Sequence, residues 1–401
     1  MGHNYDLFTI KTIYIIINLL CMLVTFMYGK KIAKAKSKKA AWQFGFFIIV
    51  AYSVCIGLRF GRDIDYNNLY YSYQDIGKDF IKSDYEIVFK IICWTLYQIG
   101  IPYSGFIWLC SIMMVTSFLH LCIHHYREYA PLAGLIFIWE SHDVELLIRF
   151  YLAFSFLLFA LSYFKSKKYK ASIILSIMAC MTHIGMIPLV GVMVAMSFLK
   201  GLFAPPVIIM LLFLGSTFLA RVEMLQTIAP YLNILAFNDK SANYVDSYED
   251  IVSGNFSAAG SLEKEFSLIS FLVILAKWSL PVFLAPRLIK EGKLSALEAN
   301  LFMIGIIISP IFSQVHILNR YAETFTFYSV FVSSSAVYYV VRNRKNFNPF
   351  ILYYSYMVAF FTIWPAVSKV ISQEYWWHML YIWDAGDWNT IPLDYFFSET
   401  I

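Results

Sequence analysis

The densest group of chemically versatile side chains follows the second long apolar block of the sequence. Arg59, Arg62, Asp63 and Asp65 stand close together there, and Tyr66 comes next. A guanidinium donates two parallel hydrogen bonds and therefore suits the oxygens of a phosphate group. A neighbouring carboxylate can accept a proton from a hydroxyl group. The segment is a candidate site for a phosphate-linked substrate, although such charges can equally form salt bridges at a helix end.

Two further candidates, Arg149 and His183, each interrupt an apolar stretch. Ionisable residues in apolar spans usually face a cavity and mark a functional pathway, and a histidine can act as a base or a hydrogen-bond donor near neutral pH. Both also have structural explanations. Glu145 precedes Arg149 by four residues and can pair with it on one helical face, and a lone histidine is often a hydrogen-bonded structural residue. No second histidine stands at metal-ligand spacing, so we predict no metal site.

Later in the chain, two more cations lie at or within apolar spans. Arg320 precedes Tyr321, and Glu323, one helical turn deeper, can neutralise it. Lys277 can reach an anionic headgroup or a pyrophosphate, or it can extend its ammonium group towards water. The sequence therefore offers cations in several separate stretches, and the elements between them decide which stretches meet.

Those elements belong to an unusually apolar chain. Of its 401 residues, 60% are hydrophobic and 14% are charged, whereas soluble proteins are roughly half apolar and a quarter charged. The apolar residues form long blocks that approach the roughly 20 residues needed to cross a bilayer. The first block is followed by lysines and not by a small-residue cleavage site, so we interpret it as a retained span. The predicted class is an all-α polytopic membrane protein.

The basic residues indicate how the chain is threaded. Lysines and arginines gather in short loops between apolar blocks, and such loops stay in the cytoplasm. The apolar segment near 86–100 is short and contains Lys90, so we predict a helix that re-enters or lies along the outer interface. This choice gives about 12 transmembrane helices with both termini outside. We expect these spans near residues 7–28, 41–58, 105–122, 129–141, 146–164, 170–183, 184–199, 205–221, 267–287, 294–315, 318–341 and 347–367.

The predicted organisation is one multi-span transmembrane domain, residues 1–368, with outer loops at 59–104 and 222–266. Residues 170–199 are tight for two crossings, and we place a turn near His183 within them. A periplasmic, aromatic-rich tail follows at residues 369–401. Its tryptophans suit the headgroup layer as an anchor, or they form a platform for sugar rings. The cysteines lie in or beside apolar segments, so we predict no disulfide framework.

Together these segments resemble the EpsG-like, Wzy-type polysaccharide polymerases. That family shows an Arg-x-Gly-x-Gly-x-Asp-Tyr stretch at the outer end of its second span. Arg59, Gly61, Asp65 and Tyr66 fit this stretch in register, and Asp63 replaces the second glycine. The resemblance extends over residues 45–330. Shorter segments that resemble further family motifs contain Glu86, Arg149 with Phe150 where glutamine is usual, His183, and the pair Arg320-Tyr321.

The resemblance implies an enzyme of the bacterial inner (cytoplasmic) membrane with its active site facing the periplasm or cell exterior. Such a glycosyltransferase polymerises undecaprenyl-pyrophosphate-linked oligosaccharide repeat units for O-antigen, capsule or exopolysaccharide. The reaction needs positive groups beside the departing pyrophosphate and a base for the acceptor hydroxyl. Candidates for binding are Arg59, Arg62, Arg149, Arg320, Tyr321, Tyr66 and Lys277. Candidates for the base are Asp63, Asp65, Glu86 and His183, of which we favour Asp65 or His183 without separating them.

The pyrophosphate linkage supplies the energy, so no cofactor is expected. Membrane lipids would be further partners, and a chain-length regulator protein is an optional one. The basic runs abut apolar spans, so we expect no nucleic acid. One alternative is a GT-C-type transferase that adds a single sugar from a lipid-phosphate donor. Another is a flippase for the lipid-linked unit, for which internal symmetry and charges spread through the core would be typical.

Overall fold

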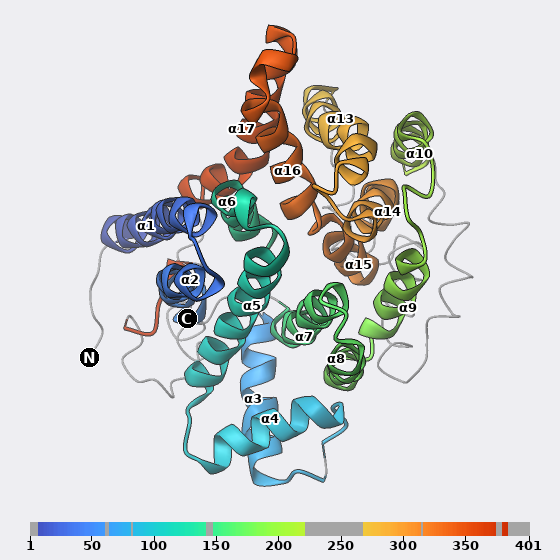
Figure 1. Ribbon diagram of the computed structural model, residues 1–401. Coiled ribbons are helices and arrows are strands. Elements are labelled where there is room, and N and C mark those ends of the chain that lie inside the picture. Colours follow the sequence, from blue (N-terminus) through green and yellow to red (C-terminus); the bar gives the residue numbers. More distant parts are fainter. Residues whose placement is uncertain are drawn as a thin grey trace. The chain divides into compact units, whose positions relative to one another are not determined.

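The computed structural model describes residues 7–60, 64–81, 83–141, 147–220, 268–313, 316–373 and 379–383. Within these ranges the regular structure is helical (Figure 1), and one isolated antiparallel bridge joins Arg59 to Tyr381. Seven helical segments within these ranges are long and apolar enough to cross a membrane, one of them the segment Leu318–Arg342, and five shorter apolar helices accompany them. The predicted class, an all-α polytopic membrane protein, is confirmed.

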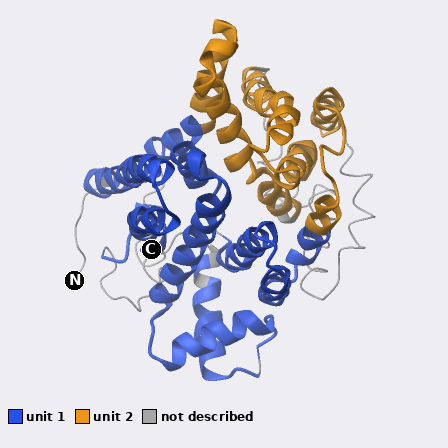
Figure 2. Cartoon of the chain, in the orientation of Figure 1, with its two compact units in different colours: residues 1–191, 363–401 blue, residues 192–362 orange. Residues whose placement is uncertain are grey.

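The chain forms two compact units (Figure 2). Unit 1 contains residues 1–191 and 363–401, and unit 2 contains residues 192–362. The single transmembrane domain expected from the sequence stays a prediction. Helices α9 (Met186–Ser197) and α17 (Pro349–Ile371) each continue from one unit into the other.

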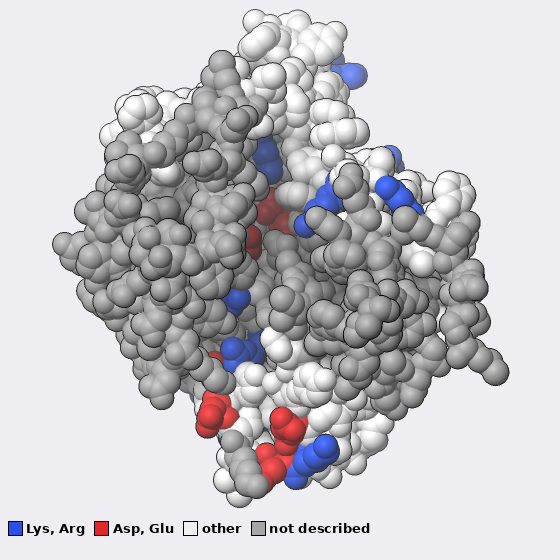
Figure 3. All heavy atoms as spheres, turned by 180° about the vertical axis from the view of Figure 1, so that it is seen from behind, with Lys and Arg blue, Asp and Glu red and all other residues white. Residues whose placement is uncertain are grey.

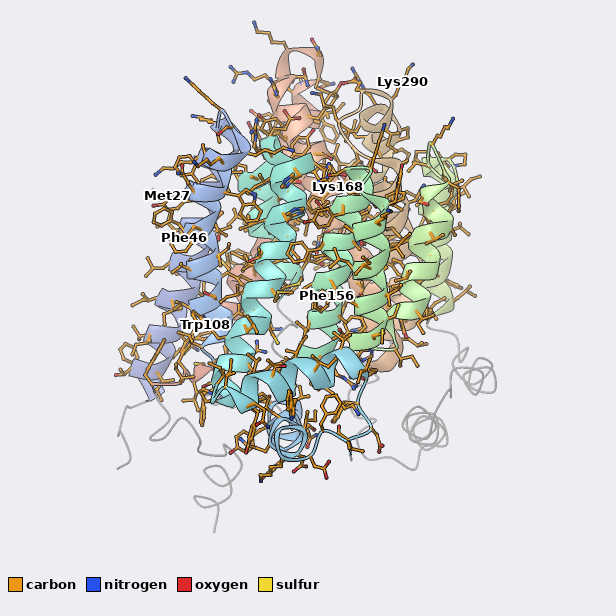
Figure 4. All side chains as sticks on the ribbon, turned by 60° about the horizontal axis from the view of Figure 1, so that its bottom comes forward. Met27, Phe46, Trp108, Phe156, Lys168 and Lys290 are labelled. Carbon is orange, nitrogen blue, oxygen red and sulfur yellow. The ribbon has the colours of Figure 1, made fainter. Side chains whose placement is uncertain are left out.

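Unit 1 is a helical bundle in which α5 is central and packs against both α2 and α7. A fully buried stack of Phe118 on Phe137, with ring centroids 4.1 Å apart, fills part of its core. Apolar side chains also cover its outside: Met27 and Phe46 are exposed and point away from the bundle (Figure 4). The α-helices that lie wholly in this unit are α1 (Leu7–Lys34), α2 (Lys38–Tyr52), α3 (Ile64–Lys78), α4 (Ile87–Gln98), α5 (Tyr103–His125), α6 (Ala130–Glu140), α7 (Ile148–Lys165) and α8 (Tyr169–Thr182).

The lysine-rich loops of unit 1 share one end of the bundle. Lys38 at the start of α2 and Lys168 before α8 both interact electrostatically with His120 of α5. Figure 4 shows Lys168 at the end of the bundle that lies away from α4. This grouping fits the prediction that both loops lie on the cytoplasmic side, because orientation follows the positive loops.

The opposite end of unit 1 is formed by a pair of short helices, α3 and α4, which pack against each other. Their contact is close, because a Cβ at Gly77 would overlap the ring of Tyr97. Helix α4 runs crosswise to α5 (Figure 4), and its 12 residues extend about 18 Å, less than the roughly 30 Å of a bilayer core. Acidic and basic side chains lie side by side at this end of the unit (Figure 3). The helix expected near 86–100 is confirmed, and its interfacial position remains a prediction.

A break separates α8 from α9 at the place expected from the sequence. Helix α8 ends at Thr182, α9 begins at Met186, and His183 between them has extended backbone dihedral angles of −154° and 117°. The two helices contain 14 and 12 residues, which correspond to about 21 and 18 Å. Both helices are therefore shorter than the roughly 30 Å of a bilayer core.

Unit 2 is also helical, and α14 contacts α10 and α15 along much of its length. The contact with α15 requires glycine, since a Cβ at Gly305 would lie 2.6 Å from the backbone nitrogen of Thr326. The single span expected at 318–341 is divided into two helices by a turn at residues 327–328. The bounds are α10 (Pro206–Leu219), α13 (Leu268–Lys290), α14 (Ala296–Phe312), α15 (His316–Thr326) and α16 (Ser329–Arg342). The outer loop 222–266 lies outside the described residues, as does most of the tail.

Candidate active site

Arg149, in the first turn of α7, forms an ion pair with Glu86, the residue before α4. The Nη1 atom of Arg149 donates to Oε2 of Glu86 at 2.9 Å, and the two side chains are 25% and 20% exposed. The partners are 63 residues apart in the sequence. The pair therefore ties the short helix α4 to the bundle helix α7, and its partial exposure leaves the guanidinium within reach of a bound molecule.

Aromatic rings from the start of α4 and the residues just before it support the guanidinium of Arg149. Its central carbon lies 4.9 Å from the ring centroid of Tyr85 and 5.8 Å from that of Phe89. A guanidinium stacks favourably on such rings. The rings also restrict the rotamers of Arg149, so the cation is held in place before any anion arrives. The position of this arginine is therefore fixed by α4 and not only by its own helix.

Glu86 also holds the break between α8 and α9. Its second oxygen, Oε1, accepts a hydrogen bond from the backbone N–H of Ile184 at 3.0 Å. Beside it, the backbone N–H of Gly185 donates to Nδ1 of His183 at 3.0 Å. Phe150 packs its ring edge-on against the imidazole, with centroids 5.3 Å apart. Glu86, Arg149 and His183, three residues selected from the sequence, thus meet at one place in unit 1.

Arg59 and Tyr66 lie in a second cluster at the end of the second span. The guanidinium of Arg59 is almost fully buried, with 1% of the residue exposed. Its backbone is paired with the tail: Phe60 N–H donates to Leu380 O at 3.1 Å, and Ile382 N–H donates to Leu58 O at 2.9 Å. Residues 379–383 of the tail thus pair with residues 58–60, and Arg59, the first cation of the family stretch, is buried.

A row of aromatic rings connects the two clusters. It runs from Tyr85 beside Arg149 to Tyr66 beside Phe60, and successive centroids are 5.0–6.0 Å apart. At its far end the hydroxyl of Tyr103 donates to the backbone oxygen of Tyr66 at 2.8 Å. The row indicates that Arg59 and Arg149 belong to the same end of unit 1. Its members are Tyr85, Phe89, Phe106, Tyr103 and Tyr66.

The later candidates belong to unit 2. Arg320 and Tyr321 stand on α15, where Asn319 and Glu323 hydrogen-bond to each other. Lys277 of α13 is 9% exposed, and its Nζ atom lies 4.2 Å from the ring centroid of Trp278. The ring of Trp278 stabilises the Lys277 cation within this unit. The expected convergence of Arg320 with Arg59, Arg149 and His183 stays a prediction.

Several residues of the expected site cannot be placed. Arg62 and Asp63 lie outside the described residues, and so does Glu145, the alternative partner of Arg149. Asp65 is in the first turn of α3, but its side chain is not among those described.

Two kinds of residue were not selected from the sequence: rings that support Arg149, and a buried carboxylate in unit 2. Tyr85 and Phe89 support Arg149, and their positions on either side of Glu86 are the only sequence signal for this role. Glu298 is fully buried within an apolar helix. It occupies the third position of α14 after the capping residue Ser295, where a negative charge is favoured by the helix dipole. That spacing indicates a structural role for Glu298.

These features define the class as a polytopic membrane protein in which the guanidinium of Arg149 is held in place at the end of unit 1 opposite its lysine loops. The EpsG family model matches residues 42–378, and the chain belongs to the EpsG family. Comparison with curated proteins and with solved structures returns no match. Membership confirms the resemblance and indicates a polysaccharide polymerase-like membrane protein.

Proposed function

We propose that the protein polymerises lipid-linked oligosaccharide repeat units on the outer face of the bacterial inner membrane. The donor would be a growing chain on undecaprenyl pyrophosphate, and the acceptor a hydroxyl of a new repeat unit. The observation that carries this proposal is the guanidinium of Arg149, held by Glu86 beside the break between α8 and α9. Family membership supports the same class of reaction.

The reaction exchanges one glycosidic bond for another. The bond from the anomeric carbon to the pyrophosphate oxygen breaks, and a bond from that carbon to the acceptor oxygen forms. Undecaprenyl pyrophosphate leaves with the bonding electrons, so a fixed cation beside it stabilises the transition state. Arg149 meets this requirement because its ion pair and its aromatic neighbours already fix its position.

The acceptor hydroxyl loses its proton to a base. Both oxygens of Glu86 accept hydrogen bonds from the protein, so we assign Glu86 to positioning. Asp65 in the family stretch and His183 at the break are then the favoured bases, and Asp63 is the alternative. Arg59, Arg62 and Tyr66 would help to bind the substrate.

The shortness of α8 and α9 supports a lipid-linked substrate. A break between two helices that are too short to cross a bilayer core would be reached laterally by a pyrophosphate whose lipid tail remains in the membrane. The roles of Arg320, Tyr321 and Lys277 in binding, and of a chain-length regulator as a partner, stay predictions.

The proposal is tested by replacing Arg149 with alanine in the native host and resolving the surface polysaccharide on a gel. We expect the ladder of polymer lengths to collapse to a single repeat unit. Arg344→Ala is the matched control, because Arg344 is exposed in the loop before α17, and it should leave the ladder unchanged. A normal ladder in Arg149→Ala would remove this residue from the mechanism, and repeat units stranded on the inner leaflet would favour a flippase.

A further inference from the structure

A cavity of about 520 Å³ lies in unit 2, between the loop that joins α9 to α10 and the last turns of α13. Sites for small molecules commonly have this size. Two lysines line the cavity: Lys200 from the loop, and Lys290 from the end of α13 (Figure 4). The other described residues that line it are apolar or glycine, and none of them is acidic. The cavity therefore combines two cations with apolar walls.

Neither cation is neutralised by the described part of the chain. Lys200 and Lys290 have no ion-pair or hydrogen-bond partner among the described residues. The carboxylate of Glu291, next in sequence to Lys290, is engaged elsewhere. It accepts from Nε of Arg287 at 3.0 Å and from the hydroxyl of Tyr339 at 2.6 Å. Both ammonium groups are thus available to an anion in the cavity.

The loop wall of the cavity is held in place by α14. Asn300 of this helix is fully buried. Its side-chain amide donates to Gly201 O at 2.9 Å, and its amide oxygen accepts from the backbone N–H of Phe203 at 3.0 Å. Pro205 and Pro206 follow, and the ring of a proline restricts its backbone. The wall is therefore formed before a ligand arrives, which lowers the entropic cost of binding.

Exposed apolar side chains continue from the cavity along both of its helices. Phe203 lines the cavity and is 37% exposed, and Val207 in the first turn of α10 is 57% exposed. On α13, Phe283 is 50% exposed and precedes Lys290 by seven residues, so both lie on one face of the helix. In a chain that crosses a membrane, such surfaces suit acyl chains.

We propose that the cavity binds the phosphate headgroup of an anionic phospholipid from the cytoplasmic leaflet. Lys200 and Lys290 would contact the phosphate, and the acyl chains would lie against α10 and α13. Both lysines belong to loops that the sequence places in the cytoplasm, and basic pockets between membrane helices on that side bind such headgroups. A water-soluble phosphate would leave the apolar walls uncovered. This inference does not depend on the polymerase function.

Photocrosslinking tests the proposal with the purified full-length protein in an uncharged detergent. The probe is phosphatidylglycerol with a photoreactive diazirine in one acyl chain, and mass spectrometry of peptides locates the attachment. We expect attachment to residues of the loop after α9, of α10 or of the last turns of α13. Phosphatidylcholine with the same photoreactive chain is the comparison, because it has the same acyl chains and no net charge.

Lys200→Gln and Lys290→Gln remove the two cations one at a time. We expect each to lower attachment of phosphatidylglycerol at this site about 5-fold and the double variant about 30-fold, as for the loss of one and two lysines that face an anionic lipid. Lys345→Gln is the matched control, because Lys345 is exposed in the loop before α17, and it should crosslink like the wild type. Thermal unfolding checks that every variant is folded.

Four results would overturn the proposal. They are attachment only at other helices, equal attachment of phosphatidylcholine, folded lysine variants that crosslink like the wild type, and an equal loss in Lys345→Gln. Inorganic phosphate distinguishes a lipid from a free anion. Full displacement of the probe by inorganic phosphate, with no such effect of sodium chloride at the same ionic strength, would show that the site takes a soluble phosphate and would also overturn the lipid assignment.

Discussion

At the scale of single residues, one carboxylate organises the candidate site. Glu86 accepts from Arg149 with one oxygen and from the backbone of Ile184 with the other. It thereby joins the start of α4, the start of α7 and the break after α8. A cation that is fixed in advance stabilises developing charge without reorganisation at the moment of reaction, so the value of Glu86 lies in the placement of its neighbours.

Replacing Glu86 with glutamine tests this positioning role. The amide oxygen can still accept from Ile184, while the charge that holds Arg149 is lost. We expect a loss of about 100-fold in polymerisation rate, typical of a displaced catalytic group, with a fall of about 1–3 kcal/mol in the free energy of unfolding. The double variant with Arg149→Ala should be no slower than Arg149→Ala alone, since both act through one guanidinium. Additive losses of rate would show that Glu86 has a separate function.

The identities of the site residues were accessible from the sequence, and their pairing was not. Arg149 and His183 stand out because charge in an apolar span is costly, and Glu86 was selected by resemblance. The sequence offered Glu145 as the partner of Arg149, because four residues separate neighbours on a helix. The partner in the structure is 63 residues away, and no periodicity in a single sequence indicates such a contact.

At the scale of elements, apolar block lengths predicted most helices, including the break near His183. They did not predict the turn that divides α15 from α16. The whole segment 318–342 is apolar enough to read as one span. At this place Gly305 of α14 packs closely against the backbone of Thr326 and Phe325 at the end of α15. Such close contact depends on the partner helix and leaves no mark on α15 itself.

Substitution of Gly305 measures the importance of this contact. An added methyl group would lie 2.6 Å from Thr326 N, so α14 and α15 must separate. We expect Gly305→Ala to lower the free energy of unfolding by about 1–3 kcal/mol, as for an overpacked core, and to lower the unfolding temperature in detergent. Gly215→Ala in α10 is the matched control, because no atom lies within 4 Å of the added methyl. Equal melting temperatures for the two variants would contradict the packing described for unit 2.

At the scale of the whole molecule, unit 1 has two chemically different ends. The loops around Lys38 and Lys168 lie at one end, and Glu86, Arg149 and the break lie at the other. The distribution of lysines in the sequence predicted this polarity, because positive loops stay in the cytoplasm. The sequence does not indicate how Arg320 is placed relative to this site, since apolar spans of similar length can pack in many orders.

The polarity leads to a topology test. Single cysteines at Lys168 and at Asp75, which is exposed on α3, are introduced in a Cys180→Ser background. The other five native cysteines are buried. A membrane-impermeant thiol reagent applied to intact spheroplasts should label the cysteine at 75 and not the one at 168. Labelling of both positions, or of 168 alone, would contradict the predicted orientation.

The proposed polymerase function is tested most directly by polymerisation with the purified protein. Wild-type protein, Arg149→Ala and Arg344→Ala are reconstituted separately into liposomes with lipid-linked repeat units from the native host, and the products are resolved by length. We expect a ladder and released undecaprenyl pyrophosphate for the wild type and Arg344→Ala, and single repeat units for Arg149→Ala. A ladder of normal length from folded Arg149→Ala, or no ladder from the wild type, would contradict the proposed function.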